Sequence, residues 1–496
     1  MTVHELHPAT DHVDVLIVGA GISGIGAACH LKTKVPHKTF AILEGREAIG
    51  GTWDLFRYPG IRSDSDLHTF AYEFKPWTHE KAIADAGAIL DYIREAAEEH
   101  DVLPHVRFGH KVLGASWSSQ DARWTVQVQH GDETFALTCS VLFSAAGYYS
   151  YESGFSPQFA GSEDFAGPII HPQQWPEDLD YAGKRVVVIG SGATAVTLVP
   201  AMTDKAAHVT MLQRSPSYVL TVPAKDPIAN GLRRFLGDER AYRITRRINI
   251  ARQRLVYDLS RRYPRFVRAL IRATVKQQLP AGYAVDTHFK PKYNPWDERL
   301  CAVPDGDLFK AIRAGRASVV TDHIERFTER GILLKSGREL EADVIVTATG
   351  LNLQAFGGIA MAVDGREVRL GETVTYKSMM LSGVPNFAFA VGYTNSSWTL
   401  KVDLVCDHLC RMLAHMEARG LDTVTPVLED TAMERRPLLD FQAGYVQRAV
   451  EAFPKQGSQG PWTVEMSYAR DRDRLRKGPV EDAALRFERV PSAVAA

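Results

Sequence analysis

Two glycine-rich turns carry the clearest chemical signal in this sequence. In the first, Gly19, Gly21 and Gly24 enclose Ser23, after an apolar β-branched run and before a stretch that favours a helix. Glycines at this spacing let the backbone approach a pyrophosphate at the N-terminus of the helix. Glu44, 20 residues beyond Gly24, can bond to the free hydroxyls of a ribose. The pattern predicts a dinucleotide site, and a turn used only for packing is the alternative.

The same pattern recurs further along the chain, as the turn Gly190, Ser191, Gly192, Ala193, Thr194 and Ala195. The strand after it leads to Arg214 and Ser215, the place that Glu44 occupies after the first turn. An arginine there suits a nucleotide 2′-phosphate, whereas an acid suits a free 2′-hydroxyl. We therefore expect FAD at the first turn and NADPH at the second, with Ser215 as a further phosphate donor. Arg214 as a solvated surface charge is the alternative.

Two such cofactors together imply hydride transfer from nicotinamide to flavin, so the electrons need a further acceptor. A disulfide reductase would need a redox-active cysteine pair, but the cysteines are scattered, and the spacing of Cys406 and Cys410 suits packing on one helix face. Reduced flavin can instead react with O2 to form a C4a-peroxyflavin, which enclosure and a fixed positive charge would stabilise. No metal-ligand spacing occurs in the sequence, so we expect no metal site.

Each glycine-rich turn requires a strand before it and a helix after it, and the two turns begin 171 residues apart. Two further strand-like runs, 141–147 and 344–350, end in small residues, as expected where backbone crosses between two folds close to a cofactor. We therefore predict an α/β protein with two Rossmann-like dinucleotide-binding domains, the NADP domain inserted in the FAD domain, plus a helical subdomain. The expected FAD-binding parts are residues 1–148 and 346–496, and the expected NADP-binding parts are residues 149–224 and 286–345.

The helical subdomain is expected at residues 225–285, where arginines alternate with apolar residues at helical spacing. Residues 233–276 hold 13 Arg and 1 Lys against 3 acids, although the whole chain has a net charge of −1. Three interpretations are open: solvated helices over the active-site cleft, peripheral docking on an anionic membrane, or nucleic-acid binding. No nucleic-acid recognition motif accompanies the charge, so we expect no nucleic-acid partner.

Composition places the chain among ordinary globular proteins, with 45% hydrophobic and 24% charged residues, which excludes a fibre or a wholly disordered chain. The N-terminal residues are polar and contain acids, unlike a signal peptide, and no apolar run reaches the ~20 residues of a membrane span. The odd number of dispersed cysteines favours a reduced chain. We expect a cytoplasmic protein, with peripheral membrane association as an alternative. The sequence does not indicate the oligomeric state.

Two longer motifs identify a family. Phe165, Gly167, His171, Trp175 and Pro176 reproduce the F-x-G-x-x-x-H-x-x-x-W-P fingerprint of Baeyer–Villiger flavin monooxygenases, just before the second nucleotide fold. A second signature follows the first fold, with a G-G-T-W run at 50–53, Y-P-G at 58–60 and an acid at position 64. The sequence resembles this family over essentially its whole length, and it is similar to the ethionamide-activating branch in particular.

The resemblance implies roles for individual residues. Arg299 matches the catalytic arginine that stabilises the negatively charged oxygen adduct, and Asp64 matches the active-site acid that orients it and contacts cofactor. Their alternatives are a surface ion pair and a loop cap. The expected cofactor contacts also include Thr52, Trp53, Val112, Arg62 and Ser63, the last two near the nicotinamide half of NADPH.

Three other positions are interpreted through the same resemblance. His171 is expected to couple the domains rather than to act as a base, and Tyr393 and Trp398 are expected to line the flavin or substrate cavity. Glu298 occupies a position where many relatives carry a lysine that helps to bind the 2′-phosphate. Arg214 and Ser215 are then left to hold the phosphate.

These expectations define a function: an NADPH- and O2-dependent flavin monooxygenase that converts ketones to esters or lactones, and also oxidises sulfides or thiocarbonyl compounds. Because an arginine keeps its charge at any working pH, it suits a site where negative charge develops on oxygen. One alternative is an N- or S-oxygenating flavin monooxygenase without Baeyer–Villiger activity. An alternative of another class is a non-catalytic basic flavoprotein that binds a membrane surface or a partner.

Overall fold

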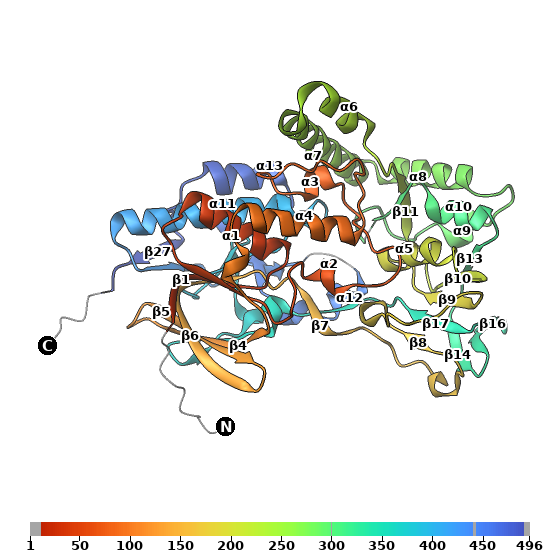
Figure 1. The fold of residues 1–496 in the computed structure, drawn as a ribbon, viewed down its shortest axis with the longest axis horizontal. Helices are drawn as coiled ribbons and strands as arrows, with labels where there is room; N and C mark the ends of the chain where they lie inside the picture. Colours follow the sequence, from red (N-terminus) through yellow and green to blue (C-terminus); the bar gives the residue numbers. More distant parts are fainter. Residues whose placement is uncertain (1–10, 299, 440–442, 491–496) are drawn as a thin grey trace.

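The first glycine-rich turn lies at the carboxyl end of an inner strand of a large mixed sheet. The computed structural model describes residues 11–298, 300–439 and 443–490 (Figure 1). The sheet has the order β20 (Arg366–Glu367), β19 (Ala360–Val363), β4 (His110–Ser118), β5 (Arg123–His130), β6 (Glu133–Ser144), β1 (His12–Val18), β2 (Phe40–Leu43) and β3 (Val106–Arg107), and β23 (Phe387–Phe389) pairs with β6. The inner strand β1 is apolar because both faces of the sheet are covered.

The two faces of this sheet bury alternate residues of β1. Val15 and Ile17 pack in one core with helices α1 (Ile22–Lys34), α4 (Ala86–Glu99) and α11 (Trp398–Arg419). Leu16 and Val18 pack in a second core with β4, β5 and the segment around Phe387. This alternation is the side-chain period of a strand. It holds β1 firmly, and so fixes the position of the turn that follows it.

The second glycine-rich turn follows β9 (Arg185–Ile189) in a separate parallel sheet. Its order is β13 (Ala317–Thr321), β10 (His208–Gln213), β9, β17 (Val344–Thr347) and β8 (Ile169–Ile170). Helices α5 (Ala193–Met202) and α10 (Asp307–Arg313) pack on it. An antiparallel sheet of β14 (Ile324–Thr328), β15 (Gly331–Leu334) and β16 (Glu339–Glu341) lies beside it.

The prediction of two nucleotide folds, with the second inserted in the first, is confirmed by this strand order. After β17 the chain returns to the first sheet as β19, β20 and β23. The outward and return crossings lie side by side, because β7 (Tyr149–Gly154) pairs antiparallel with β18 (Leu351–Leu353). One expected boundary differs from the structure: the division between residues 345 and 346 falls inside β17, which pairs with β9 as far as Thr347. The other domain boundaries stay predictions.

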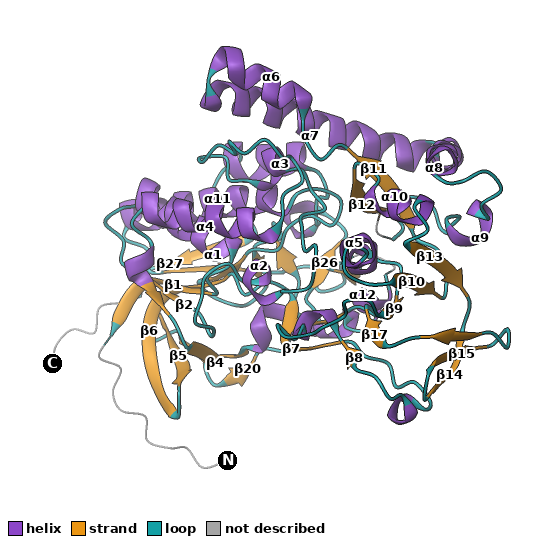
Figure 2. Cartoon of the chain, turned by 45° about the vertical axis from the view of Figure 1, so that its right-hand side comes forward, coloured by secondary structure: helices purple, strands orange, loops and turns teal. Residues whose placement is uncertain are grey.

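Three helices form a layer above both folds, and we call them the helical layer: α6 (Pro227–Leu236), α7 (Asp238–Arg262) and α8 (Pro264–Gln278). Figures 1 and 2 place them along one edge of the molecule, with α6 and the adjacent part of α7 standing out from the rest. Asp226 caps α6 by accepting from the backbone N–H groups of Ile228 and Ala229. An aspartate at this position satisfies backbone donors that the helix leaves unpaired.

The remaining elements connect these parts. The short helices are α2 (Thr52–Leu55), α3 (Leu67–Phe70), α9 (Val285–His288), α12 (Gly444–Gln447) and α13 (Tyr468–Asp471). The remaining strands pair as β11 (Tyr218–Val222) with β12 (Leu300–Pro304), β21 (Thr375–Tyr376) with β22 (Met380–Leu381), β24 (Thr423–Pro426) with β27 (Leu485–Glu488), and β25 (Arg435–Pro437) with β26 (Lys455–Gly457).

Short helical turns complete the chain: η1 (Leu103–His105), η2 (Ser162–Asp164), η3 (Pro172–Gln174), η4 (Ala355–Gly358), η5 (Leu370–Glu372), η6 (Val450–Ala452), η7 (Gly460–Trp462) and η8 (Arg472–Lys477). Within the described ranges, none of the helices combines the length and the apolar character needed to cross a bilayer.

Candidate active site

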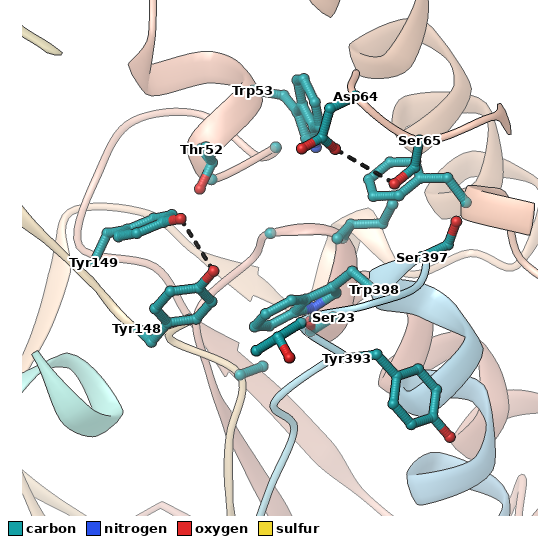
Figure 3. A pocket seen from close by; sticks show the side chains of 18 of the residues that line it. Ser23, Thr52, Trp53, Asp64, Ser65, Tyr148, Tyr149, Tyr393, Ser397 and Trp398 are labelled. Atoms are coloured by element: carbon teal, nitrogen blue, oxygen red, sulfur yellow. Dashed lines mark hydrogen bonds between the residues drawn. The ribbon is translucent and has the colours of Figure 1, made fainter. Parts of the chain in front are cut away.

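A cavity of about 1140 Å³ extends from the first glycine-rich turn to residues of α6 and α7 in the helical layer. Figure 3 shows some of the side chains that line it. It is larger than the ~300–1,000 Å³ typical of a pocket for one drug-sized ligand. Its walls come from the first fold, from the crossing strand β7, from the β11–β12 pair and from α7 and α11. The space is therefore sufficient for a large cofactor together with part of a second molecule.

The first glycine-rich turn forms one end of this cavity, where Gly19, Gly21, Ser23 and Glu44 line it. The Glu44 carboxylate accepts hydrogen bonds from the backbone N–H groups of Ala20 (2.8 Å) and Arg46 (3.0 Å). Burial raises the pKa of Glu44, although these two donors oppose the shift. The carboxylate is thus held against the turn, on the wall of the cavity.

Gly24, also predicted as a cofactor contact, does not line the cavity. A Cβ atom at Gly24 would collide with the carbonyl oxygen of Gly19. The third glycine is therefore required for the close approach of α1 to the preceding strand, which is the packing role that this position has in dinucleotide folds. Gly19 itself has a φ of +99°, a conformation that favours glycine.

The segment after α1 supplies further predicted contacts: Thr52, Trp53 and Asp64 line the cavity, as does Val112 on β4. Figure 3 shows Trp53 and Asp64 close together on the side away from Tyr148 and Tyr149. Asp64 is exposed, and one carboxylate oxygen accepts from the Ser65 hydroxyl at 3.3 Å. Four predicted positions thus meet around one space.

Arg62 and Ser63 lie elsewhere, outside the residues that line the cavity. The Arg62 guanidinium forms an ion pair with Asp307, at the start of α10 in the second fold. The Ser63 hydroxyl is buried, donates to the carbonyl of Ser65 and accepts from its N–H group. Ser63 therefore shapes the loop that presents Asp64, and Arg62 ties that loop to the second fold.

Aromatic side chains from distant segments form the opposite wall. The indole N–H of Trp398, the first residue of α11, donates to the hydroxyl of Ser23 at 2.8 Å. The ring of Tyr148 stacks on Trp398 with centroids 5.2 Å apart, and its hydroxyl is 3.0 Å from that of Tyr149 (Figure 3). Tyr393 also lines the cavity. These contacts join the crossing strand, α11 and the glycine-rich turn into one rigid wall.

A buried charged cluster supports this wall from behind. Asp471 accepts from the Tyr393 hydroxyl at 2.7 Å and pairs with the Lys401 ammonium at 2.8 Å. Burial raises the pKa of Tyr393, and the neighbouring carboxylate raises it further; burial lowers the pKa of Lys401. The phenol therefore stays protonated and keeps donating to Asp471, so the ring is held in place.

The second glycine-rich turn lies away from this cavity, and none of its six predicted residues lines it. The Ser191 hydroxyl donates to the backbone carbonyl of Ser215 at 3.1 Å and lies 2.9 Å from the Ser217 hydroxyl. Thr194 is hydrogen-bonded to Tyr58, from the Y-P-G run, and Gly60 packs closely on α5. The Y-P-G run at 58–60 therefore joins the second turn and its helix to the first fold.

The space around Gly192 is open, because a Cβ atom there would meet no described atom within 4 Å. Arg214 and Ser215 are both exposed beside this turn. A helix N-terminus with open backbone N–H groups and an adjacent guanidinium fits a pyrophosphate with a further phosphate. The residues of the second turn therefore fit a dinucleotide, as those of the first turn do.

Glu298, which replaces the lysine of many relatives, is half-buried. Burial raises its pKa, and the positive charge of Arg214 lowers it again in part. The two side chains are therefore close enough to interact, so Glu298 partly offsets the positive charge of Arg214. The predicted catalytic residue Arg299 lies outside the described residues.

His171 of the fingerprint lies on the crossing between the folds and does not line the cavity. Its Nε2 is 3.0 Å from the carbonyl oxygen of Gly350, and its Nδ1 accepts from the N–H group of Gln173 at 3.2 Å. Burial lowers the pKa of His171. A neutral ring that donates from Nε2 satisfies both contacts. Trp175 packs against the core of the second fold.

Helices over the active-site cleft were one interpretation of the sequence, but the sequence did not identify which residues of α7 line the cavity. Gln253 lines the cavity and donates to the Asp66 carboxylate at 2.6 Å, while it accepts from the Ser396 hydroxyl at 2.9 Å. Arg252 and Val256 of the same helix are also in the lining. No motif marks these positions, because their role depends on how α7 lies across the first fold.

Fold and site together define an α/β protein in which a cavity begins at the glycine-rich turn of one dinucleotide-binding fold and extends toward a second. Residues 68–232 match the flavin-binding monooxygenase-like family, and residues 17–79 match an NAD(P)-binding Rossmann-like domain. The chain is 55% identical over 486 residues to the FAD-containing monooxygenase EthA of Mycobacterium tuberculosis, covering 98% of this chain and 99% of that one. The chain therefore belongs to the flavin-binding monooxygenase family, which confirms the resemblance.

Other relatives and solved structures agree with this assignment. The probable FAD-binding monooxygenase AlmA of an Acinetobacter species is 47% identical over 480 residues, 96% of each chain. Among solved structures, an oxidised steroid monooxygenase bound to NADP has a TM-score of 0.76 at 21% identity, and covers 96% of this chain and 100% of its own. The open crystal structure of cyclohexanone monooxygenase has a TM-score of 0.76 at 20% identity. The match covers 97% of this chain and 100% of that one. At such identities these structures establish the fold.

Proposed function

We propose that this protein is an NADPH- and O2-dependent monooxygenase that converts ketones to esters or lactones and also oxidises sulfides or thiocarbonyl compounds. The observation that carries the proposal is the cavity that joins the first glycine-rich turn to Asp64 and to an aromatic wall. This cavity supports the proposal because it would hold a flavin and still leave room for an apolar substrate. Solved structures of the same fold include a steroid monooxygenase and a cyclohexanone monooxygenase, which supports this reaction class.

Both cofactors have candidate contacts. Gly19, Gly21 and Ser23 would hold the pyrophosphate of FAD, and Glu44 would accept from its ribose hydroxyls. Gly192, with the rest of the second turn and with Arg214 and Ser215, would hold NADPH. When bound, FAD supplies the two-electron chemistry that activates O2, with electrons from NADPH.

The chain itself would contribute enclosure and charge. The stacked rings of Tyr148 and Trp398 form one side of the cavity, where they would exclude water from the reacting atoms. The Arg299 guanidinium would stabilise the negative charge that develops on oxygen, since an arginine stays protonated at any working pH. Asp64 would orient that guanidinium by a charge-assisted hydrogen bond.

Location is part of the same proposal. The five cysteines are all buried and are dispersed along the chain, a pattern that favours a reducing, cytoplasmic compartment.

The test of this function is the variant Arg299→Ala, compared with Arg299→Lys and with Arg366→Ala as a control on the surface. We expect Arg299→Ala to keep its flavin absorbance and to lose about 100- to 1000-fold in the rate of ester formation from a simple ketone. NADPH consumption measured beside product formation separates failed oxygen transfer from failed reduction. Near-complete ester formation by Arg299→Ala would contradict the assignment, and sulfide oxidation with no ester from wild type would favour an N- or S-oxygenating enzyme.

A further inference from the structure

Exposed apolar side chains are concentrated in the helical layer. Thirteen large apolar side chains are exposed among the described residues, and eleven of them lie in segment 228–270. We call this set the apolar surface: Ile228, Phe235, Leu236, Ile244, Ile248, Leu255, Val256, Leu259, Tyr263, Phe266 and Leu270. Phe235 is 86% exposed and Phe266 is 68% exposed. Scattered apolar side chains are normal on a protein surface, but a cluster of this size marks an interaction site.

Helix α7 exposes apolar side chains to solvent and buries mostly polar ones. Ile244, Ile248, Leu255 and Leu259 are spaced by four, seven and four residues, so they form a stripe along one side of the helix. All four are exposed. The buried positions of α7 are mostly polar: Ala241, Tyr242, Thr245, Arg246, Asn249 and Ser260. A helix that only covered the fold would have the opposite arrangement.

Polar contacts fix this orientation of α7. Asn249 donates to the carboxylates of Asp66 (3.0 Å) and Asp226 (3.2 Å). Arg246 donates to backbone carbonyls of the α3 segment, including that of Ala71 at 2.7 Å, and pairs with Asp403 of α11 at 3.2 Å. Rotating the helix to bury its apolar stripe would leave these buried groups unpaired. The stripe therefore faces outward in the folded chain.

Arginines border the apolar stripe on both sides. At 100° per residue, Arg240 and Arg247 follow one border of the stripe and Arg252 lies along the other. Ion pairs in this region involve Arg246, Arg254, Arg261 and Arg272. The other exposed arginines have no carboxylate at ion-pair distance in the described part of the chain: Arg234, Arg240, Arg243, Arg247, Arg252, Arg262 and Arg265. Their charges remain available to an anionic partner.

The apolar surface also reaches the mouth of the cavity. Ile228 and Val256 belong to both, since each lines the cavity and each is exposed to solvent, at 51% and 41%. Arg252, also exposed, lines the cavity beside them. A partner seated on this surface would therefore face the opening through which an apolar substrate enters.

We propose that the apolar surface and its arginines dock the protein on an anionic phospholipid membrane, and that apolar substrates enter the cavity from the bilayer. An exposed apolar stripe bordered by arginines matches the acyl and phosphate layers of such a membrane. A second copy of the chain seated face to face would place the two arginine rows opposite each other, which is unfavourable. The route of the substrate rests on the proposed function, whereas the docking does not.

The direct test is flotation of the flavin-loaded protein with vesicles of phosphatidylcholine, with and without phosphatidylglycerol. We expect binding to the anionic vesicles, weakening as salt rises, and little binding to phosphatidylcholine alone. Absence of binding to the anionic vesicles at low salt would overturn the proposal. Flotation requires no turnover, so its result is independent of whether the enzyme oxidises ketones.

The apolar contribution is tested by the triple variant Ile248→Ser, Leu255→Ser and Phe266→Ser, whose residues lie outside the cavity lining. Each loses apolar area that a bilayer would bury, so we expect the partition coefficient to fall about tenfold or more. Ile169→Ser, at an exposed apolar residue of β8, is the matched control and should bind as wild type does. Unchanged binding by the triple variant would contradict an apolar contact.

The charge contribution is tested by Arg240→Gln, Arg243→Gln and Arg247→Gln together. Each arginine should contribute about 1 kcal/mol near an anionic surface, so each loss should lower binding about fivefold. The matched control removes three exposed charges elsewhere, by Lys335→Gln, Arg338→Gln and Arg366→Gln. If the control weakens binding as much, the attraction is a general charge effect and the proposal is wrong.

Two further measurements complete the test. Sedimentation without lipid reports self-association, and a dimer lost in the apolar variant without vesicle binding by wild type would assign the surface to a second copy. Turnover of a water-soluble ketone should be equal in wild type and both triple variants, whereas turnover of a long-chain ketone confined to vesicles should fall with binding. If the variants turn over the long-chain ketone in vesicles as fast as wild type does, the substrate does not enter from the bilayer and this part of the proposal is wrong.

Discussion

At the scale of single residues, the buried carboxylate of Glu44 is the most directly testable part of the flavin cradle. Glu44→Gln keeps the size of the side chain but removes the charge that would strengthen its bonds to ribose hydroxyls. A hydrogen bond to a charged group contributes about 1.5–3 kcal/mol, so we expect FAD to bind about 10- to 100-fold more weakly. Titration of the flavin-free protein with FAD measures this change.

The matched control is Glu47→Gln, three residues further on, exposed and outside the cavity lining. It removes the same charge from the same segment and should leave FAD affinity unchanged. Equal affinities in the Glu44 variant and wild type would remove Glu44 from the proposed site.

Substitutions at Gly190 and Gly192 of the second turn should have different effects, the first on stability and the second on cofactor binding. Gly190 has a φ of +141°, and a Cβ atom there would collide with the carbonyl of Ala348, so Gly190→Ala should lower the melting temperature. Gly192 has open space around it, so Gly192→Ala should fold with unchanged stability. If this space receives the pyrophosphate of NADPH, the same variant should raise the KM for NADPH severalfold.

Thermal unfolding and steady-state kinetics on both variants separate the two effects. An unchanged KM in Gly192→Ala would show that the cofactor does not approach this backbone, and a stable Gly190→Ala would contradict the close packing against Ala348.

At the scale of elements, α11 links the cavity wall to the C-terminal segment. Its His408 is buried, and Nδ1 lies 2.7 Å from the carbonyl oxygen of Leu475. Arg411, one turn further, donates to the carbonyls of Leu475, Arg476 and Gly478. Burial lowers the pKa of His408 from 6.5 to about 4, and the nearby charge of Lys377 adds to this shift.

This shift predicts a loss of stability in mild acid. Below pH 6.5 the unfolded chain binds a proton at His408 while the folded chain does not, so stability falls as the pH drops toward 4. The loss attributable to His408 should reach about 2 kcal/mol near pH ~5. His408→Gln, which can still donate to Leu475, should remove this part of the pH dependence. Exposed His323→Gln is the control.

Denaturant unfolding of the three proteins between pH ~7.5 and ~5 measures the difference in slope. If the wild type and His408→Gln lose stability in parallel, His408 is not the group responsible.

At the scale of the whole molecule, Arg246 joins the helical layer to the first fold. Its guanidinium reaches backbone carbonyls of His68, Thr69 and Ala71 and the carboxylate of Asp403. Arg246→Met would leave a buried carboxylate without this partner, which costs about 3–5 kcal/mol. We expect a lower melting temperature and early proteolysis in segment 225–285, ahead of the two nucleotide folds.

Arg246→Lys should recover little of this stability, because an ammonium cannot match the planar set of donors. The neighbouring Arg247→Met, at an exposed position, is the matched control. A full recovery by lysine would mean that charge alone holds the layer. Proteolysis that begins in a nucleotide fold would contradict the role of Arg246 as the anchor.

The elements around the glycine-rich turns could be predicted from sequence because their signals are local. The apolar runs at 13–18, 39–43 and 185–189 predict three strands. The last is found at Arg185–Ile189 as expected, and the first two, found at His12–Val18 and Phe40–Leu43, differ by one residue each. Strands buried on both faces favour apolar β-branched runs, and a glycine-rich turn directly after such a run distinguishes it from a buried helix. The end of β17 at Thr347 was less well predicted, because small residues follow it without a sharp break.

The sequence alone predicted the candidate residues of the first fold: Gly19, Gly21 and Glu44 by their spacing and Asp64 by the family resemblance, and all four line one cavity. Tertiary structure decided what no spacing encodes. It placed Gln253 of α7 and the ring of Tyr148 on the cavity wall, tied Arg62 to Asp307, and turned the apolar stripe of α7 outward. These features depend on contacts between residues that lie hundreds of positions apart in the sequence. Which side chains are buried or paired is therefore decided only when the whole chain packs.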